Sequence, residues 1–168
     1  MLKKKQLKKQ FNNAIKNANP TTLSILNKKK WSYKKSLKNA IWNKDYLTIF
    51  LLTGSITERI VNRKIDYTKH EENIPFSFRL SALSNSKGYF TEFECKRFSV
   101  IYRDLRNPAA HGDEPPAPYT TNDINLCLKV VYTLLKTDIT HVVSGVKAEA
   151  LTKWRFEEQR QKRNRIAI

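Results

Sequence analysis

The sequence predicts an all-α fold, an up-and-down helical bundle with basic helical or flexible extensions at both ends. Apolar residues recur at helical spacing through most of the chain, whereas the alternating polar and apolar runs that are typical of strands are rare. Only four of the 168 residues are glycine, and the sequence has no internal repeat. With 40 % apolar residues, a chain of this length can bury a substantial hydrophobic core.

The N-terminal part is predicted to begin with a short Lys-rich helix, which the Asn19-Pro20 pair interrupts. Farther along, Trp31 and Tyr33 lie between two groups of lysines, an arrangement that suits either base stacking or packing on the core. Packing is the expected role of Trp42, because apolar and aromatic residues lie next to it and one turn on. The apolar face of the first helix comprises Leu7, Phe11, Ala14 and Ile15.

The strongest helix is predicted over residues 45–65, which carry a broad apolar stripe. A short helix over 76–83 and a longer one over 91–106 follow it, with polar loops before and between them. The residues of the longer helix that are predicted to face inward are Phe93, Phe98, Ile101, Tyr102 and Leu105.

Two further helices complete the predicted bundle. Residues 121–123, with the sequence Thr-Asn-Asp, are predicted to cap a helix that follows the proline-containing loop at 111–119. A last helix is predicted to run from Val146 into the basic tail. Cys95 and Cys127 lie on apolar helical faces and are predicted to be buried free thiols.

The charge of the chain is concentrated at its two ends. The sequence has 32 Lys and Arg against 15 Asp and Glu, a net charge of +17. Residues 1–44 carry 13 lysines and no acidic residue, residues 153–168 have a net charge of +4, and the region between them is neutral. Such blocks suit a polyanion, for which a nucleic-acid backbone is the usual candidate. We therefore predict a Lys-rich N-terminal extension (1–35), a helical bundle (36–142) and a basic C-terminal helix or tail (143–168).

Composition argues against several other classes of protein. Two cysteines cannot form a disulfide scaffold, and three scattered histidines add few ligands for a zinc site, so we expect neither a metal nor another cofactor. No apolar run is long enough to span a membrane, and no apolar segment follows the basic start as it would in a signal peptide. The expected location is the cytoplasm.

One segment combines Arg106 and His111 with four residues between them. The spacing alone is a weak signal, because the chain has ten arginines. Its context is more particular, since Pro108 inside a continuous helix would delete a hydrogen bond and clash with the preceding turn. We therefore predict Asn107 as an N-cap and a kink or break between Arg106 and Pro108, which would let the Arg and His side chains reach one phosphate.

The sequence Arg-Asn-x-Ala-Ala-His-Gly at residues 106–112 resembles the R-x4-6-H motif of HEPN domains, the higher-eukaryote and prokaryote nucleotide-binding domains. Residues 45–58 resemble the first bundle helix of the HEPN branch found attached to restriction enzyme subunits, in which an acidic residue often stands at the position of Glu58. Residues 88–91 resemble the loop before the motif helix of that branch. The resemblance covers residues 36–140 and leaves both basic ends uncovered.

The resemblance implies a bundle that dimerises through its motif helices. It implies a metal-independent endoribonuclease, as many HEPN domains are, or a non-catalytic RNA-binding or scaffold module, as others are. Carried over residue by residue, Arg106 would be the phosphate-binding cation, Asn107 the polar residue after it, and His111 the acid or base. HEPN toxins that are regulated by nucleotidylation carry a Tyr two residues after the His, where this chain has Asp113, so regulation of that kind is not expected.

RNA supplies its own nucleophile, the 2′-OH, so an enzyme needs only to move protons and to stabilise negative charge on the phosphoryl group. A histidine moves protons near neutral pH, and an arginine offers a rigid, permanently charged fork. In a dimer, one His111 could act as base and the other as acid, and DNA would not be cut. We predict Arg106, Asn107, His111 and Glu58 as the catalytic residues, with no metal.

We therefore predict a ribonuclease of a prokaryotic defence, stress or toxin system. It is expected to act as a cytoplasmic homodimer on RNA, with a cognate antitoxin or another defence-system protein as its partner. The predicted nucleic-acid-binding residues are Lys28, Lys29, Lys30, Lys34, Lys35 and Arg103.

Three alternatives remain open at this point. The chain could be a non-catalytic adaptor that keeps the motif as a dimer or ligand contact, or a basic protein of the ribosome or membrane surface. The motif could also be structural, with Arg106 paired to Asp104 or Asp113. Glu58 could reach into the site as an orienting group or pair with a nearby arginine of its own helix.

Overall fold

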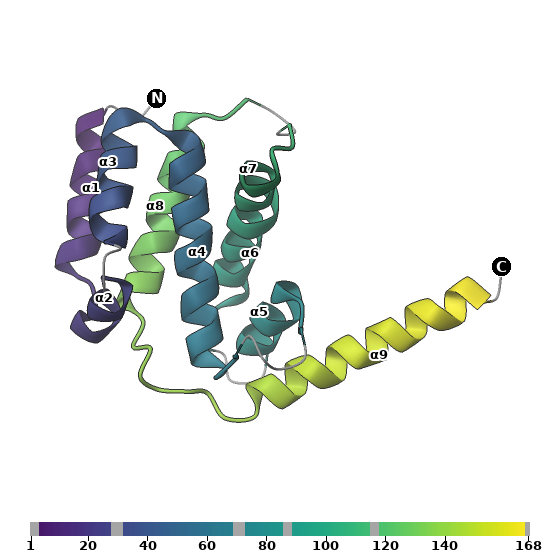
Figure 1. The fold of residues 1–168 in the computed structure, drawn as a ribbon. Coiled ribbons are helices and arrows are strands. Elements are labelled where there is room, and N and C mark those ends of the chain that lie inside the picture. The colour runs from purple at the N-terminus through teal and green to yellow at the C-terminus, as the bar shows by residue number, and fades with distance from the viewer. Residues whose placement is uncertain (1–3, 28–31, 69–72, 86–88, 115–117, 167–168) are drawn as a thin grey trace.

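The computed structural model describes residues 4–27, 32–68, 73–85, 89–114 and 118–166. Every regular element in these ranges is helical and none is a strand, which confirms the predicted all-α bundle (Figure 1). The elements in order are α1 (Lys4–Lys16), α2 (Pro20–Leu26), α3 (Tyr33–Asn43), α4 (Tyr46–Lys64), α5 (Phe76–Asn85), α6 (Glu92–Val100), the π-helix η1 (Ile101–Arg106), α7 (Asn107–His111), α8 (Thr121–Lys136) and α9 (Val146–Ile166).

Helix α4 is the centre of the bundle and packs against α3, α8 and η1 (Figure 1). Its start is fixed by Asp45, whose side chain accepts a hydrogen bond of 3.1 Å from the backbone N–H of Thr48. Phe50 and Ile60 are completely buried at these contacts. The helix predicted over residues 45–65 is therefore present. The two elements that carry the motif, η1 and α7, pack against it.

Helices α6 and α8 begin with capping boxes, in which a threonine and an acidic residue three positions on satisfy each other's backbone N–H groups. In α6 the pair is Thr91 and Glu94. In α8 it is Thr120 and Asp123, so this helix is capped one residue earlier than predicted. The difference arises because Thr120 has the extended backbone of a cap, whereas Thr121 is already buried in the first turn.

Helix α1 belongs to the packed bundle. Leu7, Phe11 and Ala14 are each only 1 % exposed and join the same core as α3 and α8. The ring of Phe11 meets that of Trp42 edge-on at 5.8 Å, so Trp42 has the predicted packing role. The segment predicted as an N-terminal extension thus contributes core residues, and its exposed lysines, such as Lys5, Lys9 and Lys16, form a basic surface.

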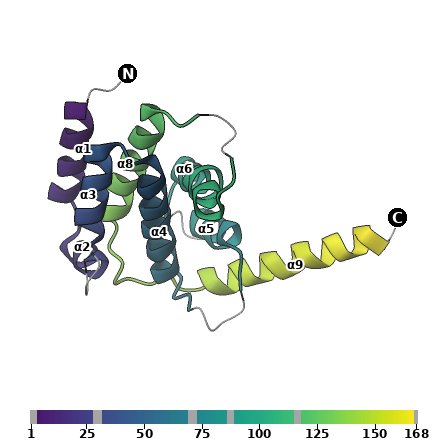
Figure 2. The same ribbon diagram turned by 45° about the horizontal axis from the view of Figure 1, so that its top comes forward.

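Helix α9 runs away from the bundle along most of its length, as two views agree (Figures 1 and 2). Its first turns pack on α5, where Val146 and Ala150 are buried, whereas Phe156 is 65 % exposed. The predicted last helix from Val146 into the basic tail is therefore present. In the described ranges, no helix has the combination of length and apolar character needed to cross a membrane.

The predicted inward face of the helix over residues 91–106 is wrong at one position. Phe93 is 61 % exposed and lies under the guanidinium of Arg97 at 3.9 Å. Cys95 and Phe98 face the core instead, and Phe93 lies two positions before Cys95, about 200° around an α-helix. Cys95 and Cys127 are buried free thiols, as predicted.

Candidate functional site

The segment that carries the motif is a continuous helical rod in which a π-helical turn replaces the expected break. The backbone stays in the right-handed helical region from Val100 to Asn107, and the backbone N–H of Asn107 bonds the Tyr102 carbonyl five residues back. Asn107 is therefore not an N-cap, which corrects the prediction. The wider π-helical turn accommodates Pro108, which has no N–H to donate, and Gly112 ends the rod in a left-handed conformation.

Arg106 is the last residue of η1, and its side chain is held from three sides. Its Nη1 donates a hydrogen bond of 3.0 Å to Oδ1 of Asn107, and its guanidinium lies 5.0 Å from the ring centre of Tyr102. On the opposite side its aliphatic part lies against Gly54 of α4. The Arg106 side chain remains 26 % exposed. An arginine that is fixed in this way and still reaches solvent is suited to bind an anion.

Glu58 of α4 is shared between two arginines. Its Oε2 lies 4.0 Å from Nη2 of Arg106, and its Oε1 lies 3.8 Å from Nη2 of Arg79 on α5. Among the residues that the structure describes, Glu58 has no ion pair with Arg59 or Arg63 of its own helix. The structure therefore places Glu58 at ion-pair distance from Arg106.

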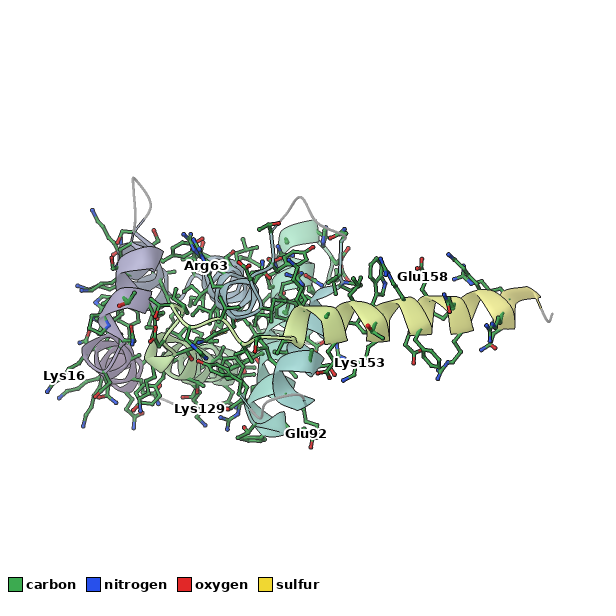
Figure 3. All side chains as sticks on the ribbon, turned by 90° about the horizontal axis from the view of Figure 1, so that it is seen from below. Lys16, Arg63, Glu92, Lys129, Lys153 and Glu158 are labelled. Atoms are coloured by element: carbon green, nitrogen blue, oxygen red, sulfur yellow. The ribbon has the colours of Figure 1, made fainter. Side chains whose placement is uncertain are left out.

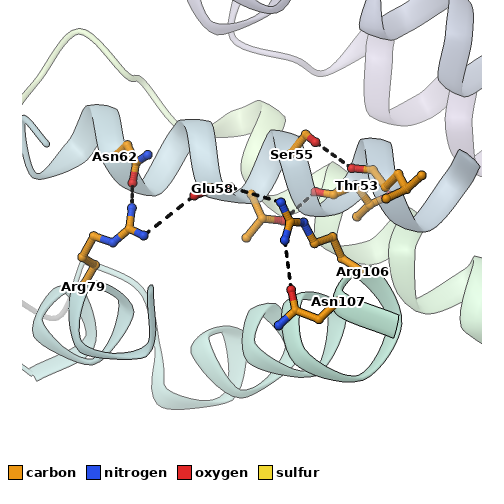
Figure 4. A network of polar contacts seen from close by, with 9 residues as sticks. Thr53, Ser55, Glu58, Asn62, Arg79, Arg106 and Asn107 are labelled. Carbon is orange, nitrogen blue, oxygen red and sulfur yellow. Dashed lines mark hydrogen bonds and ion pairs between the residues drawn. The ribbon is translucent and has the colours of Figure 1, made fainter. Parts of the chain in front are cut away.

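Arg79 is only 5 % exposed. Its Nη1 donates a short hydrogen bond to Oδ1 of Asn62, and its guanidinium lies 4.3 Å from the ring centre of Tyr67. Burial lowers the pKa of Arg79, and the neighbouring Glu58 acts in the opposite direction. Figure 4 shows the resulting row of polar side chains across α4, α5 and the motif rod, namely Asn62, Arg79, Glu58, Arg106 and Asn107.

An open groove of about 690 Å³ lies beside this network. Arginines outnumber acidic residues in its lining, which favours an anionic occupant. The lining residues are Tyr33, Ser55, Glu58, Arg59, Asn62, Arg63, Asp66, Tyr67, Thr68 and Arg106. Within the described ranges, no group of three or more His, Cys, Asp or Glu side chains is placed to hold a metal ion.

His111 does not line this groove. It is exposed at the end of α7, and within the described ranges its side chain has no hydrogen-bond or ion-pair partner. Because the rod continues through Pro108, residues 106 and 111 are displaced by about 140° around the helix. The expected kink that would bring both side chains to one phosphate is therefore absent within one chain.

The predicted nucleic-acid-binding residues have different surroundings. Lys34 and Lys35 are exposed in the first turn of α3, directly after Tyr33, which lines the groove. Arg103 is exposed but forms a two-armed ion pair with Asp104, at 2.5 and 3.0 Å. Asp104 therefore pairs with Arg103 and not with Arg106. The predicted binding residues Lys28, Lys29 and Lys30 lie outside the described residues.

Sequence reasoning missed two residues that shape the site. Arg79 is the one charged residue of α5, and a lone charge in such a helix is a signal of a buried ion pair. Gly54 lies in the middle of the longest apolar helix, where glycine is intrinsically unfavourable and so marks a close approach. Neither signal identifies the contacting partner, because both contacts join separate helices.

Comparisons with protein-family models, curated proteins and solved structures found no match to the chain. The resemblance to HEPN domains therefore rests on the motif and its neighbouring segments alone.

Proposed function

We propose that the chain is a metal-independent endoribonuclease of a prokaryotic defence, stress or toxin system, and that it acts as a homodimer in the cytoplasm. The observation that carries the proposal is the arrangement of Arg106, held by Asn107 and paired to Glu58 at the edge of an arginine-lined groove. A guanidinium that is fixed before the substrate binds stabilises charge on a phosphoryl group without reorganisation.

In the proposed reaction the 2′-oxygen attacks the adjacent phosphorus and the bond to the 5′-oxygen breaks. A base takes the 2′-OH proton, an acid gives a proton to the leaving 5′-oxygen, and the products are a 2′,3′-cyclic phosphate and a 5′-OH. Arg106 binds the phosphoryl oxygens, and His111 moves the protons. The exposed side chain of His111 is accessible to such a substrate.

The proposed site is completed by a second copy of the chain. Arg106 faces the groove and His111 does not, so one chain does not present the pair to one phosphate. Two rods that meet across a two-fold axis would place the His111 of one copy near the Arg106 of the other. This arrangement also agrees with the dimer that the motif implies.

The lysines of α1 and α3 are proposed to hold the RNA backbone. Residues 1–44 contain no acidic residue that could neutralise them. Lys34 and Lys35 follow Tyr33 of the groove lining, so an RNA strand bound there would lead to Arg106. The distal part of α9 adds a second basic arm, which extends away from the bundle (Figure 3).

The experiment that tests this function is RNA cleavage by the purified protein in EDTA. The wild type is expected to yield 2′,3′-cyclic phosphate ends, and His111→Ala is expected to abolish cleavage with an unchanged circular-dichroism spectrum. His141→Ala is the matched control, because His141 is an exposed histidine in the loop before α9. Retained cleavage by His111→Ala would overturn the assignment of the site.

The second candidate is a non-catalytic nucleic-acid-binding or adaptor module. The separation of His111 from the Arg106 groove favours it, because an anion could bind Arg106 with no histidine nearby. This candidate predicts similar affinity for RNA and DNA of the same length, and cleavage of neither.

A further inference from the structure

Arg79 is a buried cation, and removing its charge from water costs free energy. Its side chain is 6 % exposed, and its guanidinium carbon lies 4.3 Å from the ring centre of Tyr67 and 5.5 Å from that of Phe76. Its Nε is buried and has no hydrogen-bond partner within the described ranges. A guanidinium taken out of water is tolerated only where it compensates another charge. The charge that it faces is that of Glu58.

Glu58 meets its two arginines at ion-pair distance and not at hydrogen-bond distance. The two contacts are 3.8 Å to Arg79 and 4.0 Å to Arg106, and each uses a different carboxylate oxygen. The carboxylate is therefore not locked to either guanidinium. Arg79 has a second bond, to Asn62, and is buried, whereas the side chain of Arg106 is 26 % exposed at the groove. Arg79 is the fixed partner and Arg106 is the one that a ligand can reach.

A phosphate that binds Arg106 would approach the carboxylate of Glu58. Two like charges near one arginine compete for it and repel each other, unless a second cation compensates one of them. The other charged groups in the groove lining are Arg59, Arg63 and Asp66, and in the described part of the chain none of them has an ion pair with Glu58. Arg79 is the cation that does.

We propose that Arg79 is a positioning residue that holds Glu58 when Arg106 binds a phosphate. In the free protein Glu58 orients Arg106, and in the complex Arg79 keeps Glu58 from competing with the phosphate. The proposal rests on the proposed function only in taking the phosphate of RNA as the ligand of Arg106, and it does not require cleavage.

The test is a double-mutant cycle on binding, with an RNA oligonucleotide that carries 2′-O-methyl groups and so cannot be cut by the proposed reaction. Arg79→Met leaves Glu58 uncompensated and is expected to weaken binding about tenfold, within the coupling range of charges in one network. Adding Glu58→Gln removes the competing charge and is expected to restore the affinity to within about twofold of Glu58→Gln alone. A purely structural role of Arg79 predicts that the double variant binds no better than Arg79→Met, and this result would overturn the proposal.

A conservative variant separates the charge of Arg79 from its shape. Arg79→Lys keeps the positive charge and is expected to bind within about threefold of the wild type, although it loses the contact of the guanidinium with the Tyr67 ring. A loss as large as that of Arg79→Met would contradict the proposal. If Arg79→Met does not fold, as circular dichroism would show, Arg79→Gln takes its place in the cycle and in the comparison with Arg79→Lys.

This design tests the ribonuclease activity and the role of Arg79 separately. If the wild type binds the oligonucleotide and the double variant regains affinity, but the protein never cuts RNA, the ribonuclease proposal would be wrong and the role of Arg79 would stand. If the protein cuts RNA and the double variant does not regain affinity, only the role of Arg79 would be wrong. A wild type that binds no RNA would overturn both.

Discussion

Gly54 of α4 lies directly against the aliphatic part of the Arg106 side chain. A Cβ atom at Gly54 would lie 2.3 Å from Cγ and 2.7 Å from Cβ of Arg106, closer than real Cβ contacts come. The neighbouring atoms are the first carbons of the side chain, which cannot swing away as its far end could. The missing side chain of Gly54 is therefore what lets Arg106 cross α4 and reach Glu58.

The variant Gly54→Ala is expected to displace Arg106 and slow RNA cleavage by about tenfold to a hundredfold, because small errors in placement are costly at a reacting centre. Alanine favours a helix by about 1 kcal/mol over glycine, but overpacking costs about 1–3 kcal/mol, so the free energy of unfolding is expected to fall. Cleavage assays and urea unfolding would measure the two effects.

Ser55→Ala is the matched control for this substitution. Ser55 is the next residue of α4 and also lines the groove, but its hydroxyl donates a hydrogen bond to the Leu51 carbonyl of its own helix and not to Arg106 or Glu58 within the described ranges. It is expected to keep nearly wild-type activity. A Gly54→Ala protein that is more stable than the wild type and fully active would contradict the close contact between Gly54 and the Arg106 side chain.

The fold was largely predictable because helical periodicity and caps are local signals. Apolar spacing identified α4 and α8, and the pair Thr91 and Glu94 marks a capping box that the sequence itself displays. Phe93 was predicted to face the core because it is apolar, but it lies on the opposite face of the helix from the buried Cys95. Apolar residues also occur at protein surfaces, so residue type alone does not show whether a side chain is buried.

The site was less predictable because its contacts join helices that are distant in the sequence. Glu58 was suggested by resemblance. Its second arginine, Arg79, lies on α5, and residue spacing does not predict how α5 packs against α4. The rule that proline breaks a helix assumes hydrogen bonds four residues back. At Asn107 the bond spans five residues, so the rod continues through Pro108 and carries His111 away from the groove.

Phe11→Ala is expected to destabilise the protein by about 3–5 kcal/mol, the usual cost of removing a buried aromatic side chain. Phe11 is 1 % exposed and packs edge-on against Trp42. Denaturant unfolding would measure the loss, and Lys9→Gln on the exposed side of α1 is the control with little expected effect. An undisturbed midpoint for Phe11→Ala would mean that α1 is a dispensable extension.

Substituting Lys34 and Lys35 by Gln is expected to weaken RNA binding and to flatten its dependence on salt. The slope of log affinity against log salt concentration is negative, and each lost phosphate contact makes it less steep by about 0.7 for a single strand. Titrations at several salt concentrations would measure the slope. Lys96→Gln is the matched control, because Lys96 is a surface lysine already paired with Glu92 at 2.9 Å. Equal slopes for the two variants would rule out a backbone contact at α3.

The two thiols are expected to resist alkylation in the folded protein at pH 8. Burial raises the pKa of Cys95 to about 11 and that of Cys127 to about 12, above the 9.0 of an unperturbed thiol. The unfolded chain therefore releases these protons first, and the free energy of unfolding is expected to fall as pH rises from about 9 toward 12. Iodoacetamide labelling with and without urea, and melting across this pH range, would measure both effects. Rapid labelling of the native protein would contradict the burial.

Mixing two inactive variants tests whether the site is shared between two chains. If Arg106 of one copy works with His111 of the other, a heterodimer of Arg106→Ala and His111→Ala contains one intact site and one that lacks both groups. Equal mixing with free exchange makes half of the dimers heterodimers, so about a quarter of the wild-type cleavage rate is expected. Native mass spectrometry would confirm that the mixed dimer forms. If it forms without any recovery of cleavage, a shared site that needs only Arg106 of one copy and His111 of the other would be excluded.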